Sequence, residues 1–160
     1  MLQRIVDRDK DEYILFTSMY TSYCNELMQY GGPTDPVTGS EIKGIFRNKE
    51  LMCYWIIEEG ARIGFVLVGH KENKHPLADF FIGEFYIRPD YRRLNYGKTA
   101  IRDLVMKHPG KYCLYILDNN NPAKTFWQDT FTSLGYRDDS KFYTASCPPN
   151  SSFYFFTSII

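Results

Sequence analysis

Residues 80–106 read FFIGEFYIRPDYRRLNYGKTAIRDLVM, which places a strand, a turn and a helix in one segment. Apolar and aromatic residues dominate positions 80–87, a proline follows that run, and apolar residues then recur at helical spacing. The turn carries Arg92, Arg93 and Lys98 where the helix begins. Because a helix N-terminus presents free backbone N–H groups and a partial positive charge, the segment predicts a site for a phosphate or pyrophosphate.

The composition of the chain narrows the classes of protein it can belong to. Its 160 residues fit one domain, so we expect residues 1–160 to form a single unit. Lys plus Arg (19) equals Asp plus Glu (19), so the formal net charge is zero and nucleic-acid binding is not expected. The four cysteines form no CxxC pair, and no metal site is expected. Without a signal peptide or a membrane span, we expect a cytoplasmic protein that does not bind membranes.

Hydrophobic spacing and turn residues predict the elements before this segment. A helix should follow Asp9 or Asp11, and Ser40 should cap a second, shorter helix. The expected elements are a strand at 2–6, a helix to about residue 29, a loop at 31–40, a helix at 40–48, and an antiparallel hairpin of strands 51–57 and 62–68.

The same signals continue to the end of the chain. Asn121 should cap a helix that Pro122 begins and Gly135 ends. The expected elements are a strand at 78–88, a helix at 96–107, a strand at 111–117, the helix from 121, and strands at 141–146 and 153–157. This order predicts an α/β (α+β) fold, with a mixed, mostly antiparallel sheet of about seven strands and helices on both faces.

Two segments carry a recognisable pattern. In YIRPDYRRLNYGKTAI, residues 86–101, a strand leads into a turn of the form R/Q-x-x-G-x-G/A, with Asn95 in the place of the first glycine and Gly97 in that of the second. Asn is among the few residues that tolerate the left-handed conformation there. Asn121, Pro122, Ala123 and Phe126, with an end at Leu134-Gly135-Tyr136, resemble a helix pattern N-x-x-A-x-x-F-Y … G-F/Y, in which Trp127 takes the place of the tyrosine. Together these motifs resemble the GNAT superfamily of acetyl-CoA-dependent N-acetyltransferases.

The resemblance implies a cofactor site. It implies a GNAT-like sheet that splays between its fourth and fifth strands, with the pantetheine arm of acetyl-CoA in the opening, paired to backbone groups of Phe85, Tyr86 and Ile87. Asn121 and Phe126 would contact the same arm, although Asn121 could equally be a helix cap. The pyrophosphate would meet the turn formed by Arg92, Arg93, Leu94, Asn95, Tyr96, Gly97 and Lys98, whose basic side chains could otherwise be merely solvated.

The resemblance also implies a reaction, namely direct attack of a primary amine on the thioester in a ternary complex. Glu84 is the candidate base, because it stands alone among apolar residues on a central strand; the alternative is a Glu paired with Arg62 or Arg88. Trp127 cannot protonate the leaving thiolate, so the acid would be Tyr136 or Tyr143, with Tyr86 a further possibility, or water. Cys113 could be a nucleophile, but an inert buried thiol is the simpler interpretation.

The acceptor site is expected on the first helices and their loop. Tyr23, Glu26 and Tyr30 could face an ammonium group through charge and ring faces, or could be ordinary helix surface. The acceptor would be a small-molecule or peptide amine, and the protein a monomer or homodimer. Two alternatives stay open, a non-catalytic acyl-CoA-binding or interaction domain and a protein N-terminal or lysine acetyltransferase.

Overall fold

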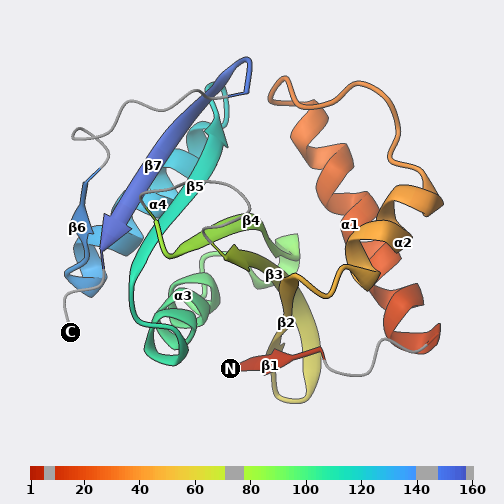
Figure 1. The fold of residues 1–160 in the computed structure, drawn as a ribbon, viewed down its shortest axis with the longest axis horizontal. Helices are drawn as coiled ribbons and strands as arrows, with labels where there is room; N and C mark the ends of the chain where they lie inside the picture. Colours follow the sequence, from red (N-terminus) through yellow and green to blue (C-terminus); the bar gives the residue numbers. More distant parts are fainter. Residues whose placement is uncertain (6–9, 71–77, 140–147, 158–160) are drawn as a thin grey trace.

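A computed structural model describes residues 1–5, 10–70, 78–139 and 148–157, and in them a seven-stranded mixed sheet lies between two pairs of helices (Figure 1). The strands follow the order β1-β2-β3-β4-β5-β7-β6 across the sheet. The strands are β1 Leu2–Arg4, β2 Leu51–Glu58, β3 Ala61–His70, β4 Phe80–Ile87, β5 Lys111–Leu117, β6 Arg137–Asp138 and β7 Ser151–Thr157. The helices are α1 Lys10–Met28, α2 Gly39–Arg47, α3 Tyr96–Lys107 and α4 Asn121–Leu134, with a short 3₁₀ turn η2 Pro89–Tyr91.

The pairing of β4 with β5 is what opens the sheet. These two strands are parallel, whereas every other neighbouring pair in the described ranges is antiparallel. Among the described residues, the two strands pair only through Phe80, Phe81 and Ile82 with residues 112–114, so β4 separates from β5 past Ile82. The mixed, mostly antiparallel sheet and the splay between the fourth and fifth strands are therefore confirmed.

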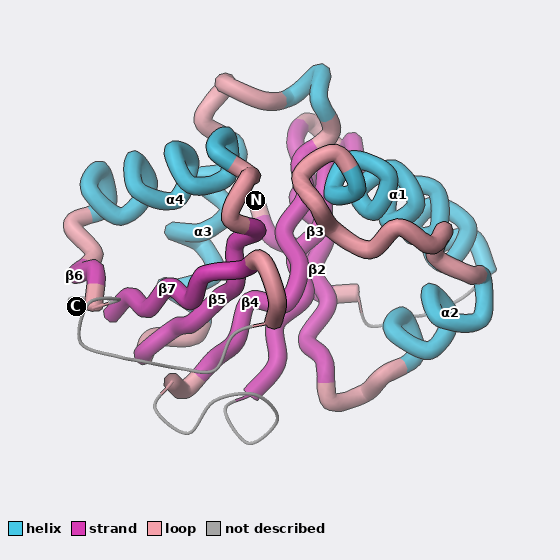
Figure 2. Tube along the Cα trace, turned by 90° about the horizontal axis from the view of Figure 1, so that it is seen from above, coloured by secondary structure: helices cyan, strands magenta, loops and turns pink. Residues whose placement is uncertain are grey.

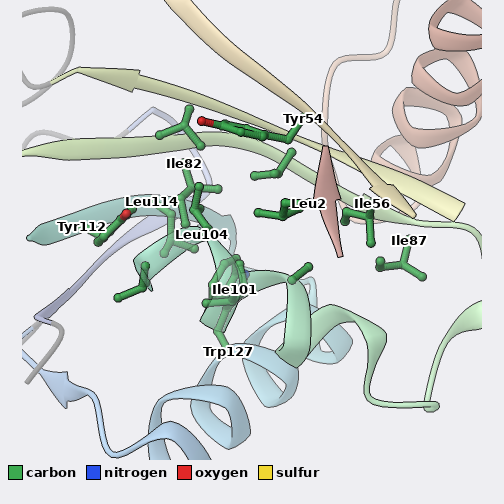
Figure 3. Packing of buried hydrophobic residues seen from close by; sticks show 14 of the residues in the cluster. Leu2, Tyr54, Ile56, Ile82, Ile87, Ile101, Leu104, Tyr112, Leu114 and Trp127 are labelled. Carbon is green, nitrogen blue, oxygen red and sulfur yellow. The ribbon is translucent and has the colours of Figure 1, made fainter. Parts of the chain in front are cut away.

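Helices α1 and α2 lie on one face of the sheet and α3 and α4 on the other (Figure 2). A hydrophobic cluster holds each pair of helices in place. Ile101 and Leu104 of α3 and Trp127 of α4 pack with strand residues such as Ile82 and Leu114 (Figure 3). On the other face, Phe16 and Tyr20 of α1 and Phe46 of α2 pack with Trp55, Phe65 and Tyr86. Full burial of each large apolar side chain contributes about 1.5–3 kcal/mol, so both helix pairs are fixed by their apolar faces.

The helix caps differ from the sequence prediction by one or two residues. Thr38, not Ser40, caps α2, because only Thr38 has a Glu three residues later; Thr38 Oγ1 accepts from the Glu41 N–H at 3.3 Å, and Glu41 Oε2 accepts from the Thr38 N–H at 2.7 Å. Asn120, not Asn121, caps α4 by accepting from the Ala123 N–H at 3.1 Å. The predicted end of α4 at Gly135 is confirmed by its left-handed φ of 67°.

The C-terminal strands were predicted only in part. β7 begins two residues before the expected position 153, and the two-residue β6 pairs with it at an edge of the sheet. The predicted strand at 141–146 lies outside the described residues. None of the helices in the described ranges is long and apolar enough to cross a bilayer.

Candidate active site

A β-bulge at Gly83 turns Glu84 toward α1. Leu67 lies opposite Glu84 and Val68 lies opposite Ile82, which leaves Gly83 as one extra residue in β4. An extra residue reverses which face the following side chains point to. Ile82 accordingly packs with α3 and α4, whereas Glu84 contacts α1 on the other face. The bulge lies where β4 leaves β5, so it places a carboxylate at the start of the opening.

Two tyrosines of α1 surround the Glu84 carboxylate. The Tyr20 hydroxyl donates to Glu84 Oε1 at 3.2 Å. Burial, followed by the charge of Glu84 and a hydrogen bond to it, raises the pKa of Tyr20 and of Tyr23 well above the usual range. Both phenols therefore keep their protons at neutral pH and can act only as donors to the carboxylate.

The two arginines considered as partners of Glu84 are engaged by other carboxylates. Arg62 forms an ion pair with Glu12, and Arg88 lies 3.8 Å from Asp90. Sequence reasoning missed Tyr20 as a contact of Glu84. A signal was available, because Phe16, Tyr20 and Tyr23 follow the i, i+4, i+7 spacing of one helix face.

Arg92 reaches α1. Its Nη1 and Nη2 donate to the two carboxylate oxygens of Glu26 at 2.7 and 2.6 Å, and its Nε donates to the Ile87 carbonyl at 2.8 Å. The guanidinium carbon lies 5.5 Å from the centre of the Tyr86 ring. The hydrogen bonds to Glu26 raise the pKa of Arg92 above its usual value, which is already high for an arginine. A residue predicted for the phosphate and one predicted for the acceptor amine are thus each other's partners.

The N-terminus of α3 is open. Asn95 adopts the left-handed conformation with φ of 65°, as the sequence analysis expects, and Arg93 does so with φ of 61°. The Asn95 side chain makes no capping hydrogen bond, unlike Thr38 in α2 and Asn120 in α4. The N–H groups of the first helical turn have no acceptor within a helix, so this end of α3 can receive an anion.

The side chains around this turn leave it accessible. Arg93 and Leu94 are exposed, and Leu94 has 55% of its surface open to solvent. Lys98 Nζ donates to Ser133 Oγ of α4 at 3.0 Å, a neutral partner that does not cancel its charge. Arg93 and Lys98 therefore keep positive charge available beside the open helix end.

Gly97 lets α3 approach α4 closely. A Cβ atom on Gly97 would lie 2.8 Å from Phe126 Cε2. The Phe126 ring stacks on Phe85, with centroids 5.4 Å apart and planes 15° apart. Trp127 is only 5% exposed and lies 5.6 Å from the Phe85 ring, so it is a core residue. Two predicted cofactor residues, Phe85 and Phe126, are therefore brought together beside the turn.

Tyr136, one of the tyrosines predicted as an acid, lies on the opposite face of the sheet from Glu84. Tyr136 stacks on Phe156, with centroids 5.6 Å apart, in the cluster on the face of α3 and α4. Tyr86 is 5% exposed, and burial raises its pKa. Tyr143 lies outside the described residues. Cys113 is fully buried and burial raises the pKa of its thiol to about 12, which agrees with an inert thiol.

The loop after α1 meets the loop after β5. A Cβ atom on Gly31 would lie 4.0 Å from the side chain of Asn119, and both loops lie at the same end of the sheet (Figure 1). Tyr30, half-buried just before Gly31, is near enough to influence the pKa of Arg92. Asn121 is exposed at the first turn of α4. Tyr30, one of the predicted acceptor residues, thus lies where the loop after α1 meets the loop after β5.

A family model described as "Acetyltransferase (GNAT) family" matches residues 16–131. No curated protein sequence gives a significant match to the chain. Solved structures that are similar include an acetyltransferase from Thermus thermophilus, with 16% identity and a TM-score of 0.67 over 97% of this chain and 96% of that one.

Two further similar structures are acetyltransferases named for an amine. An aminoglycoside 6'-acetyltransferase type Ii has 13% identity and a TM-score of 0.65 over 100% of this chain and 98% of that one. The diaminobutyrate acetyltransferase EctA from Paenibacillus lautus, in complex with its substrate and coenzyme A, has 9% identity and a TM-score of 0.63 over 99% and 94%. At such identities the likeness concerns the fold.

Proposed function

The chain belongs to the acetyltransferase (GNAT) family, and from this premise we propose that it transfers an acetyl group from acetyl-CoA to a primary amine. The acceptor is a small molecule or a peptide, and it attacks directly in a ternary complex. The observation that carries the proposal is the carboxylate of Glu84 where β4 separates from β5, on the strand whose next residue, Phe85, lies against Gly97 in the first turn of α3.

The residues around the opening fit acetyl-CoA. Past Ile82, β4 is no longer paired with β5, and an amide-bearing chain can pair with its backbone edge as an added strand would. The pyrophosphate suits the open N-terminus of α3, with charge from Arg93 and Lys98. Phe126 and Phe85 form an apolar wall beside that turn. When bound there, acetyl-CoA supplies the activated acetyl thioester.

Glu84 acts as the base in this proposal. An ammonium group must lose a proton before it can attack, and a positioned carboxylate that accepts the proton contributes about 10²–10⁴-fold to the rate. Tyr20 and Tyr23 hold that carboxylate from α1 and keep their own protons. The backbone N–H of Ile87 is a candidate donor to the carbonyl oxygen that becomes negative.

The direct test mixes the protein with acetyl-CoA and a panel of amines and follows release of the CoA thiol. The proposal predicts turnover with at least one acceptor and acetylation of its amine by mass spectrometry. CoA binding is measured separately by calorimetry. It shows whether an absence of turnover comes from a failure to bind the cofactor or from the choice of amines. Tight CoA binding without turnover for any amine would count against an enzyme.

Trp127 favours a second candidate, a domain that binds acyl-CoA without catalysis. It takes the place of the tyrosine that the family pattern uses as an acid, and it lies in the core. The Trp127→Tyr variant separates the two cases. If acid supply is what the chain lacks, this variant should gain thiol release over the wild type; if the wild type already turns over, the second candidate is excluded.

A further inference from the structure

We infer that Arg92 is a positioning residue that ties helix α1 to the end of β4, and that its side chain is not the phosphate ligand of the turn. Through this tie, occupation of the turn by CoA stiffens the C-terminal half of α1, which carries Tyr20 and Tyr23. The inference rests on the proposed function for its ligand, and it adds a link between the cofactor turn and the acceptor side.

The guanidinium of Arg92 is committed within the protein. Its Nη1, Nη2 and Nε donate to Glu26 and to the Ile87 carbonyl, at distances of 2.6–2.8 Å. A bidentate pair of this length is the strong form of an arginine–carboxylate contact. The stack of the guanidinium on Tyr86 adds a further contact. A phosphate that drew Arg92 away would have to break all of these.

The negative charge of Glu26 is unfavourable at its place in α1 unless a cation from another part of the chain lies beside it. It lies in the last turn of α1, which contains no basic residue. The C-terminal end of a helix carries a partial negative charge, so a carboxylate there is unfavourable on its own. Arg92 offsets the charge of both the carboxylate and the helix end, so the pair holds α1 against the segment that follows β4.

Other groups can meet the phosphates. Arg93 is exposed, and Lys98 donates to a neutral serine hydroxyl that it can leave at little cost. The open N–H groups of α3 lie between them in the sequence. The turn can therefore bind an anion while Arg92 stays paired with Glu26. Because Arg92 connects the turn to α1, an anion that orders the turn also restricts the motion of α1.

Tyr23 continues the link toward Glu84. Its ring packs edge-on against Tyr86, 5.9 Å between centroids, and Tyr86 is the ring that Arg92 covers. Contacts thus run from Arg92 through Tyr86 to Tyr23 and Glu84. A change in the mobility of the phosphate turn therefore affects Tyr23, which contacts the candidate base Glu84.

Hydrogen exchange of the full chain, with and without CoA, tests this inference. In the wild type, CoA should slow exchange of peptides covering residues 20–28. Arg92→Gln and Glu26→Gln should each abolish that slowing while changing the Kd for CoA by less than about threefold, because neither removes a phosphate contact. Arg93→Gln should raise the Kd by about fivefold or more and keep the slowing. Arg88→Gln, a nearby arginine that lies against Asp90, is the matched control and should change neither quantity.

A thermal double-mutant cycle adds a readout that needs no ligand. The double variant that combines Arg92→Gln with Glu26→Gln should have a Tm within about 1 °C of the less stable single variant, because both substitutions break the same ion pair. Additive losses in Tm would overturn the tie, even if CoA proves not to bind. A Kd for Arg92→Gln raised as much as that for Arg93→Gln, with α1 still protected by CoA, would make Arg92 a phosphate ligand and refute the inference. No CoA binding by the wild type would refute the proposed function instead.

Discussion

Replacement of Gly97 by alanine should destabilise the protein, although the same change inside a helix normally stabilises it. The added methyl group would lie 2.8 Å from Phe126 Cε2 and 3.1 Å from Phe126 Cζ. Contacts below 3.0 Å require movement, and the Phe126 ring can move only by leaving its stack on Phe85. Overpacking of this kind costs about 1–3 kcal/mol, whereas the helix propensity gain is about 1 kcal/mol. A net loss of up to about 2 kcal/mol is expected, which lowers Tm by up to roughly 8 °C for a chain of this size.

Gly44 provides the matched control. It lies inside α2, it is exposed, and a Cβ atom there would meet nothing within 4 Å. Gly44→Ala should therefore stabilise the protein by about 0.5–1 kcal/mol. Urea unfolding followed by tryptophan fluorescence gives both free energies of unfolding on one scale.

The Phe126→Ala background tests whether the ring is the cause. Without the ring, the nearest atom to the alanine methyl group at position 97 is Phe85 Cζ at 3.6 Å, an ordinary contact. Gly97→Ala should then be neutral or stabilising. A Gly97→Ala variant as stable as Gly44→Ala in the wild-type background, or equally destabilised without Phe126, would show that the Phe126 ring does not clash with the added methyl group.

Three further perturbations probe single groups. Tyr20→Phe removes only the hydroxyl that donates to Glu84 and should lower the free energy of unfolding in urea by about 1–3 kcal/mol. Tyr13→Phe on the same helix removes an exposed hydrogen bond and should lower it by less than about 1 kcal/mol. Equal losses would contradict the contact of Tyr20 with Glu84. Burial opposes ionisation of Asp139, but its hydrogen bonds from neighbouring side chains outweigh this and lower its pKa, so the stability advantage over Asp139→Asn should be full above about pH 4 and vanish as the pH falls below it. If the stability advantage of the wild type over Asp139→Asn instead grew as the pH falls, the pKa of Asp139 would be raised and not lowered. Cys113 should resist thiol reagents at pH 8 in the folded protein, because burial raises its pKa to about 12; stoichiometric labelling located by peptide mapping would reopen a nucleophilic role.

Local signals in the sequence were sufficient for much of the fold. Helix α3 and strand β5 have the predicted bounds, because hydrophobic spacing and the Pro109-Gly110 stop act within one segment. The left-handed Asn95 was also predictable, since few residue types tolerate that conformation. Such features depend on residues close together in the chain, which is where sequence reasoning is strongest.

The features that shape the site depend on distant residues. The bulge at Gly83 is defined by the register against β3, which single-strand periodicity does not contain. The contact of Arg92 with Glu26 joins residues 66 positions apart, and that of Tyr20 with Glu84 joins residues 64 apart. The sequence therefore indicated which residues are chemically suited to the site, but not which of them are partners.

Turnover by Glu84→Gln measures the central claim most directly, because it removes the carboxylate and preserves the shape of the side chain. With the acceptor identified in the amine panel, thiol release at pH 7 should fall by about 10²–10⁴-fold in kcat. The Kd for CoA should stay within about twofold of the wild type, since the phosphate turn and the edge of β4 are untouched. A kcat equal to that of the wild type would remove Glu84 from the mechanism and contradict the proposed active site.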